Sequence, residues 1–104
     1  MVTLEVIKKY SQYKYPGPRY KKLGKNSGEE FRDDILLPWL EKHKGEEITI
    51  DLSGAVGYPP SFLDEAFAQL IAKGHDEVKN FRFVCKDDPD VVLRLREYIN
   101  EQTK

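Results

Sequence analysis

The stretch Ile48-Thr49-Ile50-Asp51-Leu52, together with the helical pattern that begins at Ser61, decides the fold class of this chain. Its β-branched and aliphatic residues are typical of a short buried strand. Residues 53–60 contain two glycines and two prolines and therefore predict a tight loop. Over residues 61–73 apolar side chains recur every three or four positions, which predicts a helix with one face in a core. A strand, a tight loop and an amphipathic helix together indicate an α/β unit.

Further strands and helices alternate on both sides of this unit. Residues 2–7 and 78–85 have strand-like patterns, and a helix is expected to start at Ser27, where Glu30 completes the spacing of a capping box. Pro38 should kink or split that helix near Leu37. A last helix should begin at Asp88-Pro89. The 104 residues suit one α/β domain, 1–104, with a mostly parallel or mixed sheet of three to four strands packed against three to four helices.

Residues 8–26 form the least regular part of the sequence. The segment is polar, rich in tyrosine and interrupted by Pro16-Gly17-Pro18, so we expect a long basic loop with a short strand near residues 10–15. Residues 1–28 carry a net charge of +6, whereas residues 29–104 carry −7. This asymmetry indicates that the basic part faces an anionic surface or folds back on the acidic part of its own chain.

The sequence lacks the usual signatures of an enzyme. It contains no nucleophile elbow, phosphate-binding glycine loop or paired cysteine motif, and neither histidine lies at ligand spacing from a carboxylate or thiol. The prediction is a protein without enzymatic activity, cofactor or metal. A single cysteine, Cys85, is expected to be a buried thiol and favours a cytoplasmic location. No apolar run is long enough for a membrane span, so no membrane partner is expected.

Ser61 has two interpretations that can both hold. It can cap the helix that follows it, in an arrangement with Asp64 similar to a capping box. It also follows a buried strand and a short loop, at the edge of the sheet where α/β proteins bind ligands and partners. Phosphorylation at that position would change the local charge sharply without unfolding the helix.

The basic loop also has two interpretations. Its lysines and tyrosines could follow a nucleic-acid backbone, with stacking on the bases. The alternative is a solvated loop whose tyrosines pack on the edge of the domain. The acidic remainder of the chain weakens the nucleic-acid hypothesis without excluding it. The contact residues under that hypothesis are Lys14, Arg19, Lys21, Lys22 and Lys25.

Two blocks of sequence carry a resemblance to a known family. Ser27-Gly28-Glu29-Glu30-Phe31-Arg32 and Ser61-Phe62-Leu63-Asp64-Glu65-Ala66-Phe67, with Ile50-Asp51-Leu52-Ser53-Gly54 between them, resemble the STAS-like family of small bacterial and phage proteins. That family is named for its similarity to the STAS domains of anti-sigma-factor antagonists. The resemblance implies that Ser61, eight residues after Ser53, occupies the position of their regulatory serine. It also implies a partner of the GHKL-type ATPase or serine-kinase class.

The leading hypothesis is therefore a signalling module that binds a protein partner around Ser61. Where antagonists usually have Asp-Ser-Ser-Gly, this chain has Pro59-Pro60-Ser61-Phe62, which is a departure at the switch. Internal pairing with acidic residues near the strand ends is the alternative role for Arg19 and Arg32. The predicted partner contacts are Asp51, Ser53, Gly54, Gly57, Tyr58, Phe62, Asp64, Glu65 and Arg19.

Overall fold

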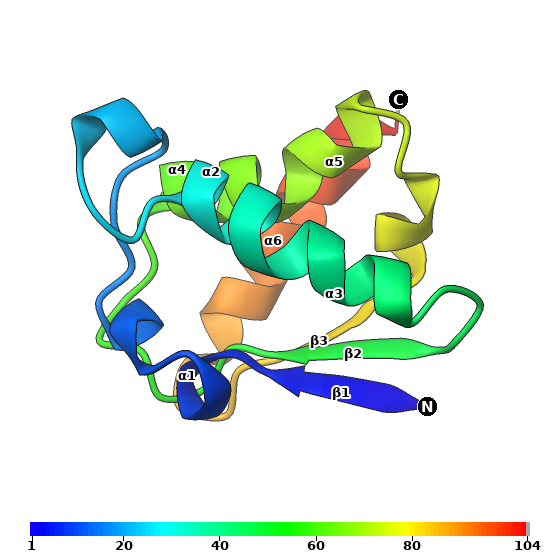
Figure 1. Ribbon diagram of the computed structural model, residues 1–104, viewed down its shortest axis with the longest axis horizontal. Coiled ribbons are helices and arrows are strands. Elements are labelled where there is room, and N and C mark those ends of the chain that lie inside the picture. The colour runs from blue at the N-terminus through cyan, green and yellow to red at the C-terminus, as the bar shows by residue number, and fades with distance from the viewer. Residues whose placement is uncertain (104) are drawn as a thin grey trace.

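A three-stranded parallel sheet forms one layer of the computed structural model, which describes residues 1–103 (Figure 1). The strands are β1 (Val2–Glu5), β2 (Ile48–Asp51) and β3 (Arg82–Val84), in the order β1-β2-β3. Val2 pairs with Ile48, and Thr49 pairs with Arg82 on the other side. The predicted α/β class and parallel sheet are confirmed.

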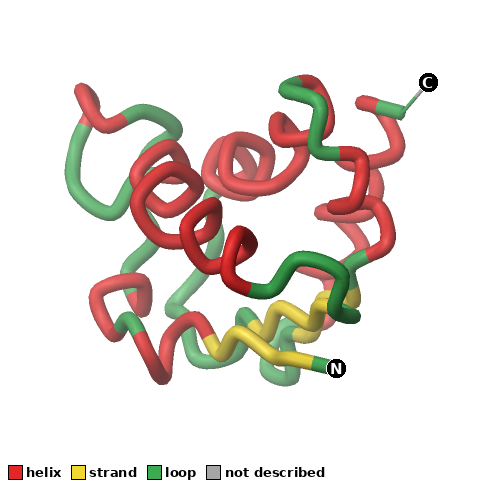
Figure 2. Tube along the Cα trace, turned by 45° about the vertical axis from the view of Figure 1, so that its right-hand side comes forward, coloured by secondary structure: helices red, strands yellow, loops and turns green. Residues whose placement is uncertain are grey.

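Helical segments make up most of the remaining chain. Several short segments follow one another directly, so residues 28–42 and 60–72 form two continuous helices (Figure 2). η1, η2 and η5 are 3₁₀ helices, whereas η3 and η4 are π-helical. The segments are α1 (Val6–Lys9), η1 (Ser11–Lys14), η2 (Lys21–Leu23), α2 (Gly28–Glu30), η3 (Phe31–Leu36), α3 (Leu37–Lys42), α4 (Pro60–Leu63), η4 (Asp64–Ala68), α5 (Gln69–Ala72), η5 (Asp76–Asn80) and α6 (Pro89–Gln102).

The helices from α2 to α5 cover one face of the sheet (Figure 1). The strand order β1-β2-β3 means that the chain moves across the sheet in the same direction in both crossovers. Because such crossovers are right-handed, the helices of both lie on the same face of the sheet. Leu4, Ile50 and Phe83 point into the core between the layers and are buried. Thr3 and Arg82, which alternate with them, are exposed. The domain therefore has two layers with one core between them.

Pro38 does not split the first long helix, contrary to prediction, because residues 28–42 remain one continuous helix in which only the hydrogen-bonding pattern changes near Leu37. The π-helical η3 ends at Leu36, and the α-helical α3 begins at Leu37. A proline lacks the amide hydrogen that an α-helix needs, so a change in hydrogen-bonding pattern just before it is the expected response. The change in pattern leaves Trp39 in the core, only 7% exposed.

Three sequence-based boundaries are wrong. The first strand ends at Glu5 instead of continuing to residue 7, because Val6 begins a helical turn. The strand expected near residues 10–15 is the 3₁₀ helix η1, which brings Tyr13 fully into the core. The third strand starts at Arg82, because residues 76–80 form η5 and bury Val78. In each place a tight helical turn buries an apolar side chain that a strand would also have buried.

Candidate functional site

The loops at the carboxyl ends of β2 and β3 are joined to each other. Ser53 Oγ accepts a hydrogen bond from the backbone N–H of Lys86 at 2.8 Å. The N–H of Gly54 donates to both carboxylate oxygens of Asp87 at 3.2 Å. Asp51 accepts from the N–H of Ser53 at 3.0 Å. Three predicted contact residues, Asp51, Ser53 and Gly54, thus lie together at a well-ordered edge of the sheet.

Two exposed apolar side chains lie at the same edge. The backbone N–H of Val56 donates to the carbonyl oxygen of Lys14 at 2.9 Å, so the loop after β2 runs beside the end of η1. Val56 is 67% exposed and Tyr15, the residue after Lys14, is 61% exposed. Gly57, another predicted contact residue, is also exposed. The sequence analysis missed Val56 and Tyr15, because an isolated apolar residue in a loop has no pattern that marks it.

Ser61 lies in the first turn of α4 and does not cap it, contrary to prediction. The helix starts one residue earlier, at Pro60, and its N-cap is Pro59. The carbonyl of Pro59 accepts from the N–H of Phe62 at 3.0 Å and of Leu63 at 3.3 Å. Proline at the first helical position loses only an N–H that has no helical partner, so Pro60 starts the helix easily. Ser61 is partly exposed and makes no capping hydrogen bond.

Two of the predicted contact residues belong to the core instead. Phe62 is 1% exposed, with its ring centroid 5.8 Å from that of Tyr58. Tyr58 is 6% exposed and its hydroxyl donates to the carbonyl of Leu52 at 2.8 Å. Burial raises the pKa of Tyr58 above its usual value, and the nearby Cys85 and Asp87 raise it further. These rings support the loop from inside and cannot contact a partner.

Both arginines of the sequence hypothesis form internal ion pairs with helical acids. Arg19 Nη1 lies 2.6 Å from Asp64 and 3.1 Å from Glu65. Arg32 binds Asp33 at 2.8 Å and also pairs with Glu65. Burial lowers the pKa of Arg32, but the hydrogen bonds to Asp33 and Glu65 outweigh that effect and the net shift is upward. Hydrogen bonding to Asp64 raises the pKa of Arg19.

These ion pairs remove Glu65 and most of Arg19 from the predicted contact surface. Glu65 is 7% exposed, and its carboxylate is shared by the two arginines. Asp64 stays partly exposed. The two helices approach closely here, because a Cβ on Gly28 would lie 2.7 Å from the carbonyl oxygen of Phe62. Glycine at position 28 therefore allows the contact across which Arg32 reaches Glu65.

Tyr13 and Glu30 form a partly buried contact that sequence reasoning missed. The Tyr13 hydroxyl donates to Glu30 Oε2 at 2.5 Å, and Tyr13 is fully buried. Burial and this hydrogen bond raise the pKa of Tyr13 above its usual value. Ser27 Oγ accepts from the N–H of Glu30 at 3.0 Å, so the predicted cap is confirmed. The Glu30 side chain binds Tyr13 and does not return to Ser27, so the reciprocal half of the capping box is absent.

Residues 17–26, named here the Gly17–Asn26 loop, form a closed loop with a fixed base. The N–H of Gly17 donates to the carbonyl of Asn26 at 2.8 Å, and the N–H of Gly28 donates to Pro18 at 2.9 Å. A Cβ on Gly17 would lie 2.0 Å from the carbonyl oxygen of Lys25, so only glycine fits there. Such closure is typical of an Ω-loop. The lysines of the nucleic-acid hypothesis, Lys14, Lys21, Lys22 and Lys25, are all exposed.

The remaining reactive groups show no catalytic arrangement within residues 1–103. His43 lies 2.7 Å from Glu46, and His75 lies 3.0 Å from Glu77, as isolated pairs. In that part of the chain no cluster of three or more His, Cys, Asp or Glu side chains could hold a metal ion. Cys85 is 6% exposed, and burial with the nearby Asp87 raises the pKa of its thiol to about 11.

Fold and site together define a small two-layer α/β domain with ordered loops at the carboxyl edge of its sheet. Residues 27–90 match the family described as STAS-like domain of unknown function (DUF4325), and the chain belongs to that family. Neither the curated proteins nor the solved structures contain a significant match. Among the described residues no helix has the length and apolar character needed to cross a membrane.

Proposed function

We propose that the chain is a non-enzymatic regulatory module that binds a protein partner at the carboxyl edge of its sheet. The observation that carries this proposal is the pair of exposed apolar side chains, Val56 and Tyr15, on two loops joined by the Val56–Lys14 hydrogen bond. Large apolar side chains on an ordered surface are typical centres of protein interfaces. The partner surface comprises Tyr15, Ser53, Gly54, Val56, Gly57, Pro60, Ser61 and Asp64.

The order of this surface favours binding. The hydrogen bonds of Ser53 and Gly54 to the turn at residues 86–87 fix the loop before any partner arrives. A surface that is already ordered loses less conformational entropy on association. Tyr58 and Phe62 support the loop from below, through packing within the core.

Ser61 is the proposed switch of this surface. Its side chain is partly exposed in the first helical turn and makes no capping bond, so modification would not remove a cap. A phosphate would add about −1.5 to −2 charges beside Pro60 at the start of α4 and would repel an apolar or acidic partner surface. The family resemblance suggests a GHKL-type ATPase or serine kinase as that partner.

The test is affinity capture from host lysate with matched variants. Val56→Glu places a charge at the centre of the proposed surface. Leu93→Glu is its control, because Leu93 is similarly exposed, at 62%, on α6. We expect one partner to be captured by the wild type and by Leu93→Glu but lost with Val56→Glu. Equal capture by all three proteins would contradict the proposal.

The switch has its own pair of variants in the same experiment. Ser61→Asp should release the partner, whereas Ser61→Ala should retain it, because only the first adds charge. Retention of the partner by both variants would keep the surface and remove Ser61 as a switch. Intact mass after incubation with the captured kinase and ATP would then show directly whether Ser61 is modified.

Nucleic-acid binding is the second candidate function, favoured by the exposed lysines of the Gly17–Asn26 loop and by Tyr20, which is 40% exposed. The test is fluorescence anisotropy with a single-stranded oligonucleotide at several salt concentrations. Changing Lys21, Lys22 and Lys25 to Ala should reduce the slope of log K against log salt by about 2 if all three contact phosphates. Absence of binding at low salt would exclude this function.

A further inference from the structure

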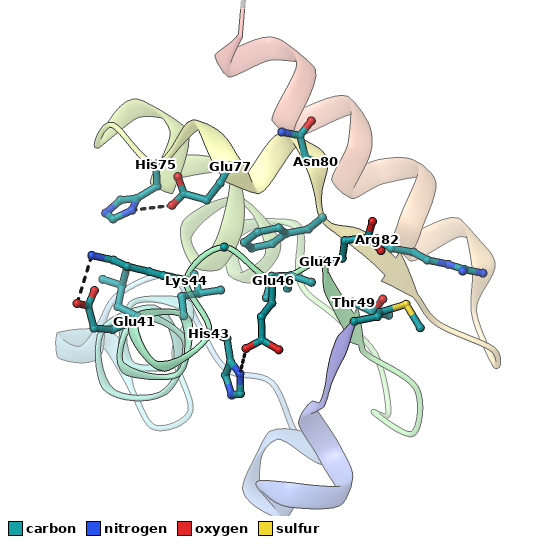
Figure 3. A pocket seen from close by; sticks show the side chains of 16 residues that line it. Glu41, His43, Lys44, Glu46, Glu47, Thr49, His75, Glu77, Asn80 and Arg82 are labelled. Carbon is teal, nitrogen blue, oxygen red and sulfur yellow. Dashed lines mark hydrogen bonds and ion pairs between the residues drawn. The ribbon is translucent and has the colours of Figure 1, made fainter.

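A large groove lies at the opposite edge of the sheet, where the strands begin (Figure 3). Its volume is about 1210 Å³, and it is open to solvent on one side. Helix α3, η5 and the loop before β2 form its walls. The apolar part of its lining consists of Met1, Leu37, Leu40, Ile48 and Phe81. Nothing in the proposed function uses this groove.

The rim of the groove is acidic. Its charged side chains, apart from the histidines, are Glu41, Glu46, Glu47, Glu77, Lys44 and Arg82. They leave two negative charges in excess before the amino group of Met1 is counted. Lys44 pairs with Glu41 at 3.3 Å, and Arg82 lies at the far side of the groove from these two (Figure 3). Among the described residues the carboxylates of Glu46 and Glu77 form ion pairs with histidine rings alone. The groove therefore suits a ligand with an apolar tip and positive charges around it.

The Gly17–Asn26 loop has that character. Leu23 is 62% exposed and Tyr20 40% exposed at its tip. Lys21, Lys22 and Lys25 surround them, and the loop contains no acidic residue. Backbone hydrogen bonds close the base of the loop, and the N–H of Lys21 donates to the Glu29 carboxylate at 2.9 Å. A preorganised apolar tip is a suitable anchor for a groove.

The loop and the groove of one molecule cannot meet. Figures 1 and 2 both place the η2 turn at one end of the molecule and the loop between α3 and β2, which borders the groove, at the other. A contact between them must therefore join two molecules. Such a contact is heterologous, because each molecule contributes a different surface, and repetition gives a ring or an open filament.

We propose that the Gly17–Asn26 loop of one copy binds in the groove of a second copy, so that the chain assembles head to tail. Leu23 and Tyr20 contact the apolar lining, and the lysines face the glutamates of the rim. Val56 and Ser61 belong neither to the loop nor to the lining of the groove, so each copy in the assembly would carry its own partner surface. The inference does not depend on the proposed function.

The first experiment is sedimentation velocity of the wild-type protein over a wide concentration range at two salt concentrations. We expect the average mass to rise with concentration and to fall with added salt, because the lysine–glutamate contacts are exposed and screened. A wild-type protein that remains monomeric at every concentration would overturn the proposal. So would an association that Leu23→Glu leaves unchanged.

Complementary variants distinguish the head-to-tail contact from a symmetric one. Leu23→Glu should prevent the loop from binding a groove. The double change Glu46→Lys and Glu47→Lys should prevent the groove from binding a loop. Each variant should weaken self-association about tenfold or more. An equimolar mixture of the two proteins should form dimers and nothing larger, because one loop and one groove remain. Self-association of the groove variant alone would indicate a loop–loop contact and would contradict the proposal.

Two controls separate these effects from general changes in fold or charge. Leu93→Glu and Lys73→Glu alter exposed residues outside both surfaces and should leave the association unchanged. Gly17→Ala opens the loop without altering its charge, because of the Cβ contact with Lys25, and should weaken association. Circular dichroism of each variant confirms that it is folded. If Gly17→Ala folds and associates like the wild type, the preorganised loop is not the contact.

Discussion

The guanidinium of Arg32 and the carboxylate of Glu65 form an ion pair that joins the two long helices beneath the surface. Their side chains are only 6% and 9% exposed. Glu65 also forms an ion pair with Arg19 at the base of the Gly17–Asn26 loop, with 3.1 Å between the guanidinium and the carboxylate. One carboxylate therefore connects both helices and the base of the loop, where Arg19 also binds Asp64 at 2.6 Å.

Removing the charge of Glu65 should destabilise the domain strongly. Glu65→Gln leaves Arg32 nearly buried with Asp33 as its remaining anionic partner, and loss of one partner of a buried pair typically costs about 3 to 5 kcal/mol. Urea unfolding followed by circular dichroism measures this loss. The control is Lys21→Ala, which breaks the exposed pair with Asp34 and should change the free energy of unfolding by less than about 1 kcal/mol. Equal effects of the two changes would refute the structural role of Glu65.

The two serines at the helix starts should differ in their effects on stability. Ser27→Ala removes the hydrogen bond to the N–H of Glu30 and should cost about 1 kcal/mol. Ser61→Ala removes no capping bond and should change the free energy of unfolding by less than about 0.5 kcal/mol. Urea titrations of both variants under one condition make the comparison. A larger loss for Ser61→Ala than for Ser27→Ala would show that Ser61 is the cap after all.

The domain should lose stability in alkaline solution. The pKa values of Tyr13 and Tyr58 are raised in the folded protein, so above the usual value of 10.0 the unfolded chain releases protons that the folded chain retains. The stabilising contribution is thus complete below pH 10 and decreases as the pH rises, by about 1.4 kcal/mol per pH unit for each tyrosine. Unfolding free energies at pH 8 to 11 test the slope. Replacing both tyrosines by Phe should reduce the slope above pH 10 and leave the contribution of Cys85, whose pKa is also raised, from 9.0 to about 11. An unchanged slope would contradict the assignment.

The Cys85 thiol should react slowly in the folded protein. With a pKa of about 11 it is about one-thousandth ionised at pH 8, and the unfolded chain with an ordinary pKa of 9.0 should react about 100-fold faster. Burial of the side chain slows the reaction further. Absorbance after addition of a disulfide reagent, with and without urea, measures both rates. Similar rates would mean that the thiol is accessible and reactive in the folded state.

Local periodicity accounts for what the sequence predicted well. The apolar rows over residues 61–73 and the alternation in residues 48–52 involve only residues that are close in the sequence. The sequence pattern alone therefore predicts the helix and the strand. The capping serine at position 27 is local in the same sense. These features define the two layers and the parallel sheet.

Contacts between distant residues account for what the sequence did not predict. Arg19 and Asp64 are 45 positions apart, and Tyr13 and Glu30 are 17 apart, so no local pattern pairs them. The second long helix was predicted to start at Ser61 but starts at Pro60, for another reason. Proline at the first helical position and serine at the cap are both favourable, and the sequence of Pro60 and Ser61 offers both.

Arg32 lies in η3 and Glu65 lies in η4, so each partner of the buried ion pair comes from a π-helical segment. A π-helical turn accommodates one residue more than an α-helical turn. Deleting one residue from either segment would restore α geometry, and the later residues of that helix would keep their directions, because the π turn has already absorbed the additional residue. Trp39 in one helix and Leu70 in the other would then stay in the core. Gains and losses of a single residue during the evolution of this domain should therefore be tolerated at these two places within its helices as well as in its loops.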